Sequence, residues 1–564
     1  MTTPIASPPV EQLIPSAAER SYGAEEKKRG AIFTKQPVVD FMLDLIGYTT
    51  AVNLAERSIL EPSFGGGRFV LSAVDRLLES WRAHGGTEYT DLVDSVRAVE
   101  LDTDTYVQFR AVLADHLTAR GVPQIDATLL VDRWLIHGDY LLTDLGLRFD
   151  FVIGNPPYVR QELIEPSLLA DYRRMYGSMV GRADLYVAFM EQSLDYLKDG
   201  GALSFICADA WLKNDYGRGI RAKISYSFHL AYYVDMYGLD AFEVPVGAYP
   251  SITVIQRSGV SGTRVVRAQS AEATHLGEVL DAVTAHSPGA GVQVLDAVRG
   301  ERPWLVSANP ALPIIHDLEE RLPTIQEAGC RVSIGVATGN DRAFIGNFDA
   351  LDVEEDRRLP LATNKCVVGG DVRWTGKGVV NPFTDGGALV DLSKYPRLAA
   401  HLERHRDALS KRHTAKSNVD KRWYRTIDRI TPSLLGQPKL FIPDIRGNGD
   451  AIAYDPGTLY PHHNLYFITA ERWNLRALQS LLRSGIAHMF VEAYSVKIGG
   501  GYLRFQAQNL KRIRVPFWED INDEDREAMI VAGESGAKLS TDLLERIYGL
   551  MPGSLAFLAE TEIP

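Results

Sequence analysis

The spacing of apolar positions divides the chain into two regions of different character. In the first region, short apolar runs typical of buried strands alternate with segments whose apolar positions recur every three or four residues, as in helices. The predicted strands lie within residues 57–81, 95–102, 134–141, 148–158, 202–212, 229–238 and 248–259, and the clearest helices lie at about 103–119 and within 185–201. Strands alternating with helices predict an α/β domain with a doubly wound, mostly parallel, Rossmann-like sheet.

The pattern changes from about Val332 onward. Gly-rich turns, short strands and polar linkers dominate there, with one clear helix within residues 395–413. This mixture is typical of an α+β domain of less regular type. We therefore expect a flexible N-terminal arm over residues 1–26, an α/β domain over 27–260, a mixed α+β domain over 261–523 and a helical tail over 524–564.

Composition narrows the class of protein without indicating a function. The 564 residues are enough for two or more domains, and the 45% hydrophobic and 23% charged residues are ordinary for a globular protein. No run approaches the roughly 20 apolar residues of a membrane span, and residues 1–20 lack the form of a signal peptide. Three scattered cysteines (Cys207, Cys330 and Cys366) suit a reducing cytoplasm and form no metal motif. We expect a cytoplasmic protein with no membrane partner and no metal site.

Net charge bears on the class of partner. The formal charge of −12 argues weakly against a polyanion, but local patches decide binding more than the total does.

The most informative stretch is Asn155-Pro156-Pro157-Tyr158, which ends an apolar run. Proline cannot continue a sheet and restrains the residue before it, so Asn155 and Tyr158 are presented on stiff, extended backbone. The Asn155 side-chain carbonyl and the Pro156 backbone carbonyl could accept both hydrogens of a ring-conjugated amine and direct its lone pair toward an electrophile. Tyr158 could stack on a base taken out of its helix. The alternative is a turn that only terminates the strand.

A glycine run at residues 65–67 follows another predicted strand and precedes a helix. In open α/β sheets, ligands bind at the carboxyl ends of the strands, where glycine lets the backbone approach them closely. Glu61, just before the run, would repel a pyrophosphate and instead suits a cation, such as the ammonium group of an amino-acid cofactor. A tight turn without a ligand is the alternative reading.

Two further strand ends carry acidic residues. Glu100 could accept from ribose hydroxyls, although Asp102 could serve instead or cap the next helix. Asp139 could accept from an adenine amine while Tyr140 flanks its ring, or Asp139 could be a solvated loop residue.

Together these residues resemble the gamma class of DNA adenine-N6 methyltransferases, found in restriction–modification and related phage-defence systems. The order of parts is the same over residues 29–34, 61–69, 99–102, 138–141 and 155–158, followed by a C-terminal target-recognition domain. The resemblance covers most of residues 27–516. It implies S-adenosyl-L-methionine as the cofactor, and N6 of an adenine flipped out of double-stranded DNA as the methyl acceptor.

The resemblance also implies roles for individual residues. Asn155 and Pro156 would hold the adenine amine, and Tyr158 and Tyr216 would sandwich the ring, Tyr216 being the best match within residues 208–221. The residues that would surround the cofactor are Thr34, Glu61, Ser63, Phe64, Gly65, Gly67, Glu100, Leu101, Asp139, Tyr140 and Pro157.

DNA contacts are expected from the second region, where basic residues are interleaved with aromatic ones. The candidates are Lys421, Arg422, Trp423, Tyr424, Lys497, Arg504 and Lys511. We expect any restriction endonuclease or other defence-system subunit to be a separate chain. Two alternatives stay open: a methyltransferase of an RNA or protein amide or amine, and a catalytically silent DNA-specificity protein.

Overall fold

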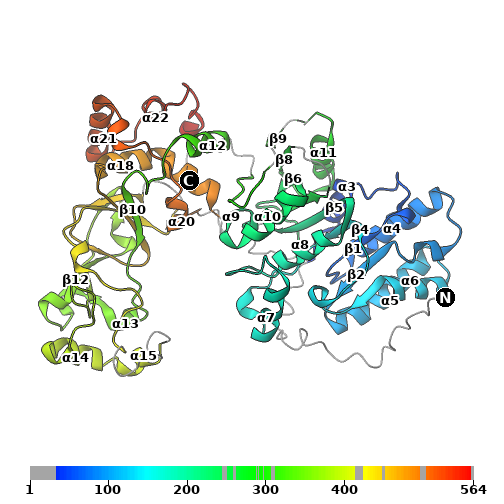
Figure 1. Ribbon diagram of the computed structural model, residues 1–564, viewed down its shortest axis with the longest axis horizontal. Coiled ribbons are helices and arrows are strands. Elements are labelled where there is room, and N and C mark those ends of the chain that lie inside the picture. The colour runs from blue at the N-terminus through cyan, green and yellow to red at the C-terminus, as the bar shows by residue number, and fades with distance from the viewer. Residues whose placement is uncertain are drawn as a thin grey trace. The chain divides into compact units, whose positions relative to one another are not determined.

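The structure is a computed structural model, and the chain in it divides into two compact units, Met1–Ala308 and Asn309–Pro564 (Figure 1). It describes residues 33–243, 250–257, 262–287, 289, 291–295, 298–306, 311–412, 423–446, 451–495 and 503–560.

The first unit is built on a nine-stranded sheet of order β3-β2-β1-β4-β5-β7-β6-β8-β9. Its strands are β1 (Ile59–Glu61), β2 (Val96–Glu100), β3 (Leu135–His137), β4 (Phe149–Gly154), β5 (Leu197–Ala208), β6 (His229–Asp235), β7 (Pro250–Gln256), β8 (Thr263–Arg267) and β9 (Gln293–Leu295). The strands from β3 to β5 pair in parallel, whereas β7 runs antiparallel to both β5 and β6. The predicted doubly wound, mostly parallel sheet is confirmed.

Helices cover both faces of this sheet. They are α3 (Gln36–Leu45), α4 (Arg68–Ala83), α5 (Thr103–Ala119), α6 (Gln124–Trp134), α7 (Pro166–Met175), α8 (Tyr186–Asp195), α9 (Ala210–Lys213), α10 (Arg218–Ser227) and α11 (Ala273–Thr284). Successive strand residues point to opposite faces, so Ile59 joins the core beneath α3 to α6, while Leu60 joins the core beneath α8 and α10. The helix predicted at residues 103–119 coincides with α5.

The sheet extends beyond the predicted boundary at residue 260. β8 pairs in parallel with β6, β9 pairs with β8, and α11 packs its Leu276 and Val279 into the same core as α3. The first unit therefore continues to residue 308. The sequence missed this extension because residues 261–330 show no clear periodicity and β9 has only three residues.

The segment around Thr34 is bound to the chain that follows β6. Thr34 forms an antiparallel bridge with Phe242, and the Lys35 N–H donates to the Ala241 carbonyl at 3.0 Å. An ion pair between Lys35 and Asp240 at 2.5 Å adds to this junction. The first residues described are thereby fixed against the chain that follows β6.

The second unit contains three smaller sheets, of orders β10-β20-β16-β18-β14-β13, β11-β15-β12-β19 and β17-β21. The strands are β10 (Cys330–Ile334), β11 (Ile345–Asn347), β12 (Arg358–Ala362), β13 (Val367–Val368), β14 (Asp371–Val372), β15 (Lys377–Val380), β16 (Lys439–Pro443), β17 (Ile445–Arg446), β18 (Ala453–Asp455), β19 (Tyr460–Pro461), β20 (Leu465–Ala470) and β21 (Leu503–Arg504). This architecture agrees with the predicted mixed α+β domain.

The helices of the second unit are short. They are α12 (Leu312–Arg321), α13 (Asp341–Phe344), α14 (Pro396–Glu403), α15 (Arg406–Ser410), α18 (Leu475–Leu481), α19 (Ala487–Tyr494), α20 (Ala507–Leu510), α21 (Asp523–Ser535), α22 (Thr541–Tyr548) and α23 (Phe557–Glu560). The single helix predicted within residues 395–413 is broken at His405 into α14 and α15. The predicted tail forms helices that belong to the second unit. Among the residues described, no helix combines the length and apolar character needed to cross a bilayer.

Candidate active site

The carboxyl ends of β1 to β4 lie at one edge of the sheet, because these four strands are parallel neighbours. The turns that follow them are linked by backbone hydrogen bonds, from the Phe64 N–H to the Val99 carbonyl at 3.1 Å and from the Gly138 N–H to the Glu100 carbonyl at 2.9 Å. A Cβ atom on Gly154 would lie 3.8 Å from Glu61 Oε1. The structure thus brings together the four strand ends singled out in the sequence.

The glycine run after β1 makes a tight turn into α4. Gly65 and Gly67 have φ values of 49° and 74°, a region that favours glycine. A Cβ atom on Gly67 would lie 1.9 Å from the Phe109 ring, and one on Gly66 would lie 2.8 Å from the Phe33 ring. Backbone conformation and close aromatic packing together therefore require glycine here.

Glu61 ends β1 as a buried carboxyl group with an exposed fraction of 4%. Its Oε2 atom makes no hydrogen bond to any residue that the structure describes. Burial first, and then the nearby Glu100 carboxylate, raise the pKa of Glu61 well above its usual value. A buried acid with an unused acceptor is suited to a cationic group that would stabilise its ionised form.

Glu100 at the end of β2 holds the neighbouring turns. Its two carboxylate oxygens accept from the backbone N–H groups of Gly65 and Asp102, each at 2.8 Å. Burial raises its pKa. The Asp102 side chain accepts from the Thr105 N–H at 3.0 Å and caps α5, which was one of the two roles considered for it. Leu101 and Ser63 lie beside these groups in sequence and are half-buried.

The turn after β3 places Asp139 and Tyr140 differently from each other. Asp139 is 8% exposed, and its oxygens accept from the Leu141 N–H at 2.9 Å and the Tyr172 hydroxyl at 2.6 Å. The Tyr140 ring is buried in the core, and its hydroxyl bonds to that of Ser193 at 2.9 Å. The Tyr140 ring is thus packed against core residues, and its contact with an adenine stays a prediction.

Asn155 follows directly after β4. Its Nδ2 atom donates to the Thr34 hydroxyl at 3.4 Å, and Thr34 itself is buried. Because the amide group is planar, this contact orients the Asn155 carbonyl oxygen away from Thr34 as an acceptor. Pro156 is buried and Pro157 half-buried, which fixes the backbone on the far side of Asn155.

Tyr158 and Tyr216 both lie next to Tyr186, the first residue of α8. The Tyr158 ring is 6.3 Å from that of Tyr186, and the Tyr186 and Tyr216 hydroxyls are 3.2 Å apart. The Tyr158 hydroxyl donates to the Ile206 carbonyl at 3.2 Å, which directs this ring toward the sheet. Burial raises the pKa of Tyr216 to about 12, so its hydroxyl is un-ionised at pH 7. The two tyrosines predicted to flank a base thus belong to one cluster.

Tyr186 was not predicted as a site residue, because its helical spacing within residues 185–201 indicates only a core position.

We expect Tyr186→Phe to lower the rate of the chemistry at this site by about 2–10-fold, because it removes the hydrogen bond to Tyr216, and a hydrogen bond contributes about 0.5–1.5 kcal/mol. The measurement is a single-turnover rate. Tyr226→Phe, at a residue that is 93% exposed, is the matched control. An unchanged rate in Tyr186→Phe would mean that its hydroxyl does not position Tyr216.

Comparisons with known proteins place this arrangement in a family. Residues 123–242 match the family model of the Eco57I restriction-modification methylase. The chain is 49% identical over 529 residues to the type II methyltransferase M.PaeR7I of Pseudomonas aeruginosa, covering 93% of this chain and 92% of the relative. The chain belongs to the type II methyltransferases. It is also 45% identical to M.XhoI of Xanthomonas vasicola, covering 93% of this chain and 97% of that protein.

A solved structure supports the fold of this type II methyltransferase over both units. The type IIL restriction-modification enzyme MmeI, solved in complex with DNA, superposes with a TM-score of 0.59. The match covers 97% of this chain and 79% of that chain at 12% identity. The family model and the two type II methyltransferases, not this structure, confirm the resemblance recognised in the sequence to methyltransferases of restriction–modification systems.

In this type II methyltransferase, the titratable residue Asp184 lies beside the tyrosine cluster, two positions before Tyr186 in the sequence. Burial raises the pKa of Asp184 from 3.8 to about 6, an effect that Arg160 partly opposes. The folded state therefore binds this proton more tightly than the unfolded state does. The resulting stabilisation is complete below about pH 4 and is lost as the pH rises through about 6.

Replacing Asp184 with asparagine removes this pH dependence. We expect Asp184→Asn to raise the free energy of unfolding by about 1–2 kcal/mol at pH 8, the pKa displacement discounted for partial exposure. The gain should be smaller at pH 5. Urea unfolding at both pH values measures it, with Asp171→Asn, at a half-buried aspartate of α7, as control. A gain that is equal at the two pH values would contradict the assigned cause.

The predicted DNA-binding residues of the type II methyltransferase have varied environments. Lys421, Arg422 and Lys497 lie outside the described residues. Trp423 is 4% exposed, so little of its ring is open to the DNA contact predicted for it, and that contact stays a prediction. The Tyr424 hydroxyl donates to the Val390 carbonyl, Arg504 forms an ion pair with Asp444, and Lys511 is exposed.

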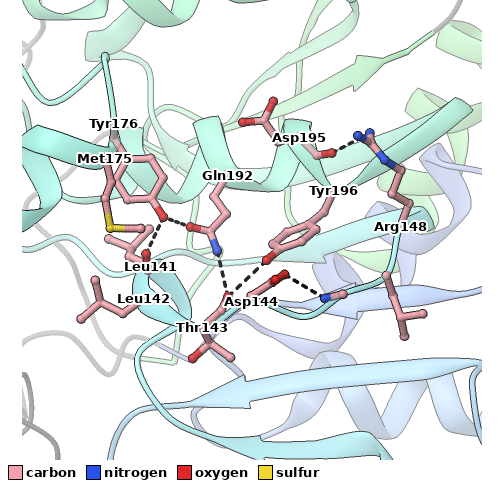
Figure 2. Close-up of a pocket in the computed structure, with 12 residues that line it drawn as sticks. Leu141, Leu142, Thr143, Asp144, Arg148, Met175, Tyr176, Gln192, Asp195 and Tyr196 are labelled. Atoms are coloured by element: carbon pink, nitrogen blue, oxygen red, sulfur yellow. Dashed lines mark hydrogen bonds between the residues drawn. The ribbon is translucent and has the colours of Figure 1, made fainter. Parts of the chain in front are cut away.

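A cavity of about 510 Å³ lies away from these sites (Figure 2). Residues of the 141–148 loop line it together with the ends of α7 and α8. Arg148 immediately precedes β4, so the cavity is at the amino end of that strand, whereas Asn155 is at the carboxyl end. Its polar groups bond to one another, as in the Tyr196 hydroxyl donating to the Thr143 carbonyl at 3.1 Å. None of the residues predicted to bind cofactor or substrate lines it.

Proposed function

We propose that this type II methyltransferase transfers a methyl group from S-adenosyl-L-methionine to N6 of an adenine that it flips out of double-stranded DNA. The observation that carries the proposal is the position of Asn155. It is held by Thr34 at the end of β4, at the same sheet edge as the glycine turn and Glu61. A rigidly held acceptor beside a cation-binding carboxyl group is what transfer from a sulfonium cofactor to an amine requires.

The residues at the strand ends fit S-adenosyl-L-methionine. Glu61 offers a buried oxygen without a partner among the described residues, which suits the cofactor's ammonium group. Glu100 and the glycine turn offer acceptors and close backbone approach for a ribose, and Asp139 offers acceptors for an adenine amine. When bound, the cofactor supplies an electrophilic methyl group on a sulfonium sulfur.

The protein's own contribution is to orient the acceptor amine. The Asn155 side-chain carbonyl and the Pro156 backbone carbonyl accept its two hydrogens, which favours a tetrahedral nitrogen whose lone pair faces the methyl group. Tyr158 and Tyr216 hold the ring between them by stacking. No strong general base is needed, because the amine loses its proton after the nitrogen has attacked.

Membership of the family supports a proposal for the biological role. As a modification enzyme of a restriction–modification system, the protein would mark host DNA against an endonuclease carried on a separate chain, or act beside another defence-system subunit. The second unit would read the target sequence, with exposed basic residues such as Lys511 contacting phosphates.

The test is single-molecule sequencing of DNA from a methylation-free host that expresses the wild-type chain. We expect N6-methyladenine at one recurrent sequence in the wild type and none in the empty host. If DNA carries no mark while the purified protein methylates RNA or a protein amide, the proposed substrate is wrong. If the cofactor binds and no substrate is methylated, the chain is a DNA-specificity protein without turnover.

A further inference from the structure

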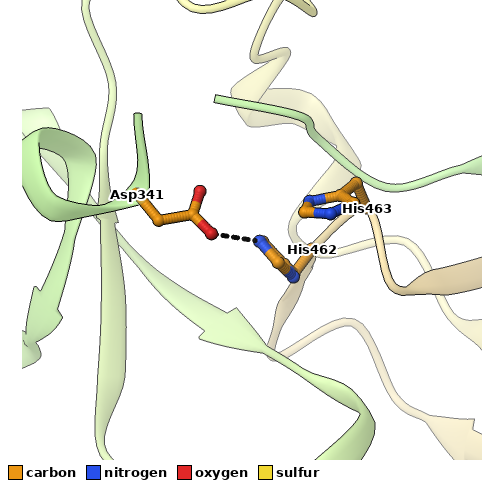
Figure 3. A group of neighbouring side chains, drawn as sticks. All are labelled: Asp341, His462 and His463. Atoms are coloured by element: carbon orange, nitrogen blue, oxygen red, sulfur yellow. Dashed lines mark ion pairs between the residues drawn. The ribbon is translucent and has the colours of Figure 1, made fainter. Parts of the chain in front are cut away.

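Three metal-ligating side chains meet in the second unit, remote in sequence from the residues of the proposed methyl transfer (Figure 3). Asp341 begins α13, and His462 and His463 follow β19. One donor atom from each of the three lies within 4.8 Å of the other two. In Figure 3 the Asp341 carboxylate points toward the His462 ring, with the His463 ring beside it.

The His462 side chain is 7% exposed, and neither of its ring nitrogens makes a hydrogen bond of good geometry within the described part of the chain. Its polar neighbours there are Asp341 and Asn464. Its Nε2 atom lies 3.4 Å from Asp341 Oδ2. Because an unsatisfied buried polar group is costly, a structure keeps such a group where something else binds it.

The backbone around the site is fixed on both sides. Val336 forms a parallel bridge with His462, and the His463 N–H donates to the Val336 carbonyl at 3.0 Å. The two segments are so close that a Cβ atom on Gly335 would lie 2.3 Å from the His462 carbonyl oxygen. The site therefore rests on rigid backbone, which is a condition for metal binding.

The carboxylate is oriented as well. The hydroxyl of buried Thr338 donates to Asp341 Oδ1 at 2.5 Å, and the same hydroxyl accepts from the Asn340 N–H at 3.1 Å. This arrangement leaves Asp341 Oδ2 directed at His462. Hydrogen bonds that orient a ligand in this way are typical of metal sites.

We propose that Asp341, His462 and His463 bind one divalent transition-metal ion of the Zn²⁺ type. Two imidazole nitrogens and a carboxylate oxygen are the donor set that such ions prefer. Ligand bonds of about 2.0–2.1 Å in tetrahedral geometry place neighbouring donors about 3.3 Å apart. The separation of Asp341 Oδ2 and His462 Nε2, 3.4 Å, is close to this value, and a donor atom of exposed His463 lies within 4.8 Å of the donor atoms of both.

The ion would join two segments that are far apart in the sequence. It links the first residue of α13 to the turn between β19 and β20. Three protein ligands leave a fourth position for water, as in open zinc sites. The inference is independent of the proposed methyl transfer, because all three ligands lie in the second unit. This metal site was not predicted from the sequence, because its three ligands form no cysteine motif.

The test uses the full-length protein, stripped with a chelator and titrated calorimetrically with ZnCl₂ at pH 7.5. We expect one ion per chain and, with Co²⁺ in its place, a visible absorption band of tetrahedral geometry. His463→Ala and Asp341→Ala should each weaken Zn²⁺ binding by at least about 100-fold, since removal of a group that merely supports a ligand costs about 10–100-fold.

Both substituted residues are exposed, so the variants should retain the wild-type circular dichroism spectrum and metal-free Tm. His316→Ala, at an exposed histidine of α12, is the matched control and should bind as the wild type does. The proposal is overturned if the wild type binds no ion at micromolar concentration. It is equally overturned if His463→Ala and Asp341→Ala bind Zn²⁺ as tightly as His316→Ala.

Discussion

Asn155→Ala is expected to lower the rate of methyl transfer to DNA by about 10³-fold while leaving the affinity for S-adenosyl-L-methionine within about threefold of the wild type. The substitution removes the acceptor proposed for the adenine amine, and loss of one such preorganised group costs about 10²–10³-fold. It leaves Glu61, Glu100 and the glycine turn unchanged. Single-turnover transfer of a labelled methyl group measures the rate, and calorimetry measures cofactor binding.

Asn155→Asp is the matched control for this prediction. Aspartate keeps an acceptor oxygen at the same position and can accept from the Thr34 hydroxyl in place of the present contact. Its rate should therefore fall less than that of Asn155→Ala. A rate for Asn155→Ala within tenfold of the wild type would show that the amine is held by other groups.

Glu61→Gln should act mainly on cofactor affinity, whereas Asn155→Ala acts mainly on the rate. We expect Glu61→Gln to weaken cofactor binding by at least about 100-fold. Glutamine keeps the shape of the side chain but cannot form an ion pair with an ammonium group, and breaking a buried pair costs about 3–5 kcal/mol. Methyl transfer should recover in part at high cofactor concentration. Isothermal titration gives the affinity, and the dependence of the rate on cofactor concentration gives the recovery.

The pH dependence distinguishes this mechanism from a loss of folding. Burial raises the pKa of Glu61, so its proton must leave before the carboxylate can bind a cation, and wild-type affinity should rise with pH. The increase should be visible above the usual carboxyl range and below the pKa of about 7.7–8.0 of an α-amino group. Glu61→Gln should show no such rise. An equal rise in both proteins would contradict an ion pair at Glu61.

The strands, helices and sheet type of the first unit could be predicted from the sequence where the pattern of apolar positions is set by a single strand or helix. The strand ending at Gly154 and helix α5 both have clear periodicity, and the parallel sheet follows from their alternation. Asn155 and the glycine run could be found because each is a local string with a backbone consequence. The contact between Asn155 and Thr34 could not, since it joins residues 121 positions apart.

Burial explains most of the remaining differences. Tyr140 and Trp423 each carry a polar group and stand beside charged residues, which favoured a contact with a ligand or DNA, yet both rings are buried in cores. Tyr186 is the reverse case, in which a core-like helical position places a hydroxyl against Tyr216. Which side of an aromatic ring meets solvent depends on packing between distant segments, and periodicity does not contain that information.

The bridge between Thr34 and Phe242 has a consequence for synthesis. The partner of Thr34 is translated 208 positions later (242 − 34), and at about 5–20 residues per second this takes roughly 10–40 s. Until then the segment that contacts Asn155 lacks this backbone bridge. A nascent chain therefore carries Asn155 well before the bridge that fixes its partner Thr34 can form.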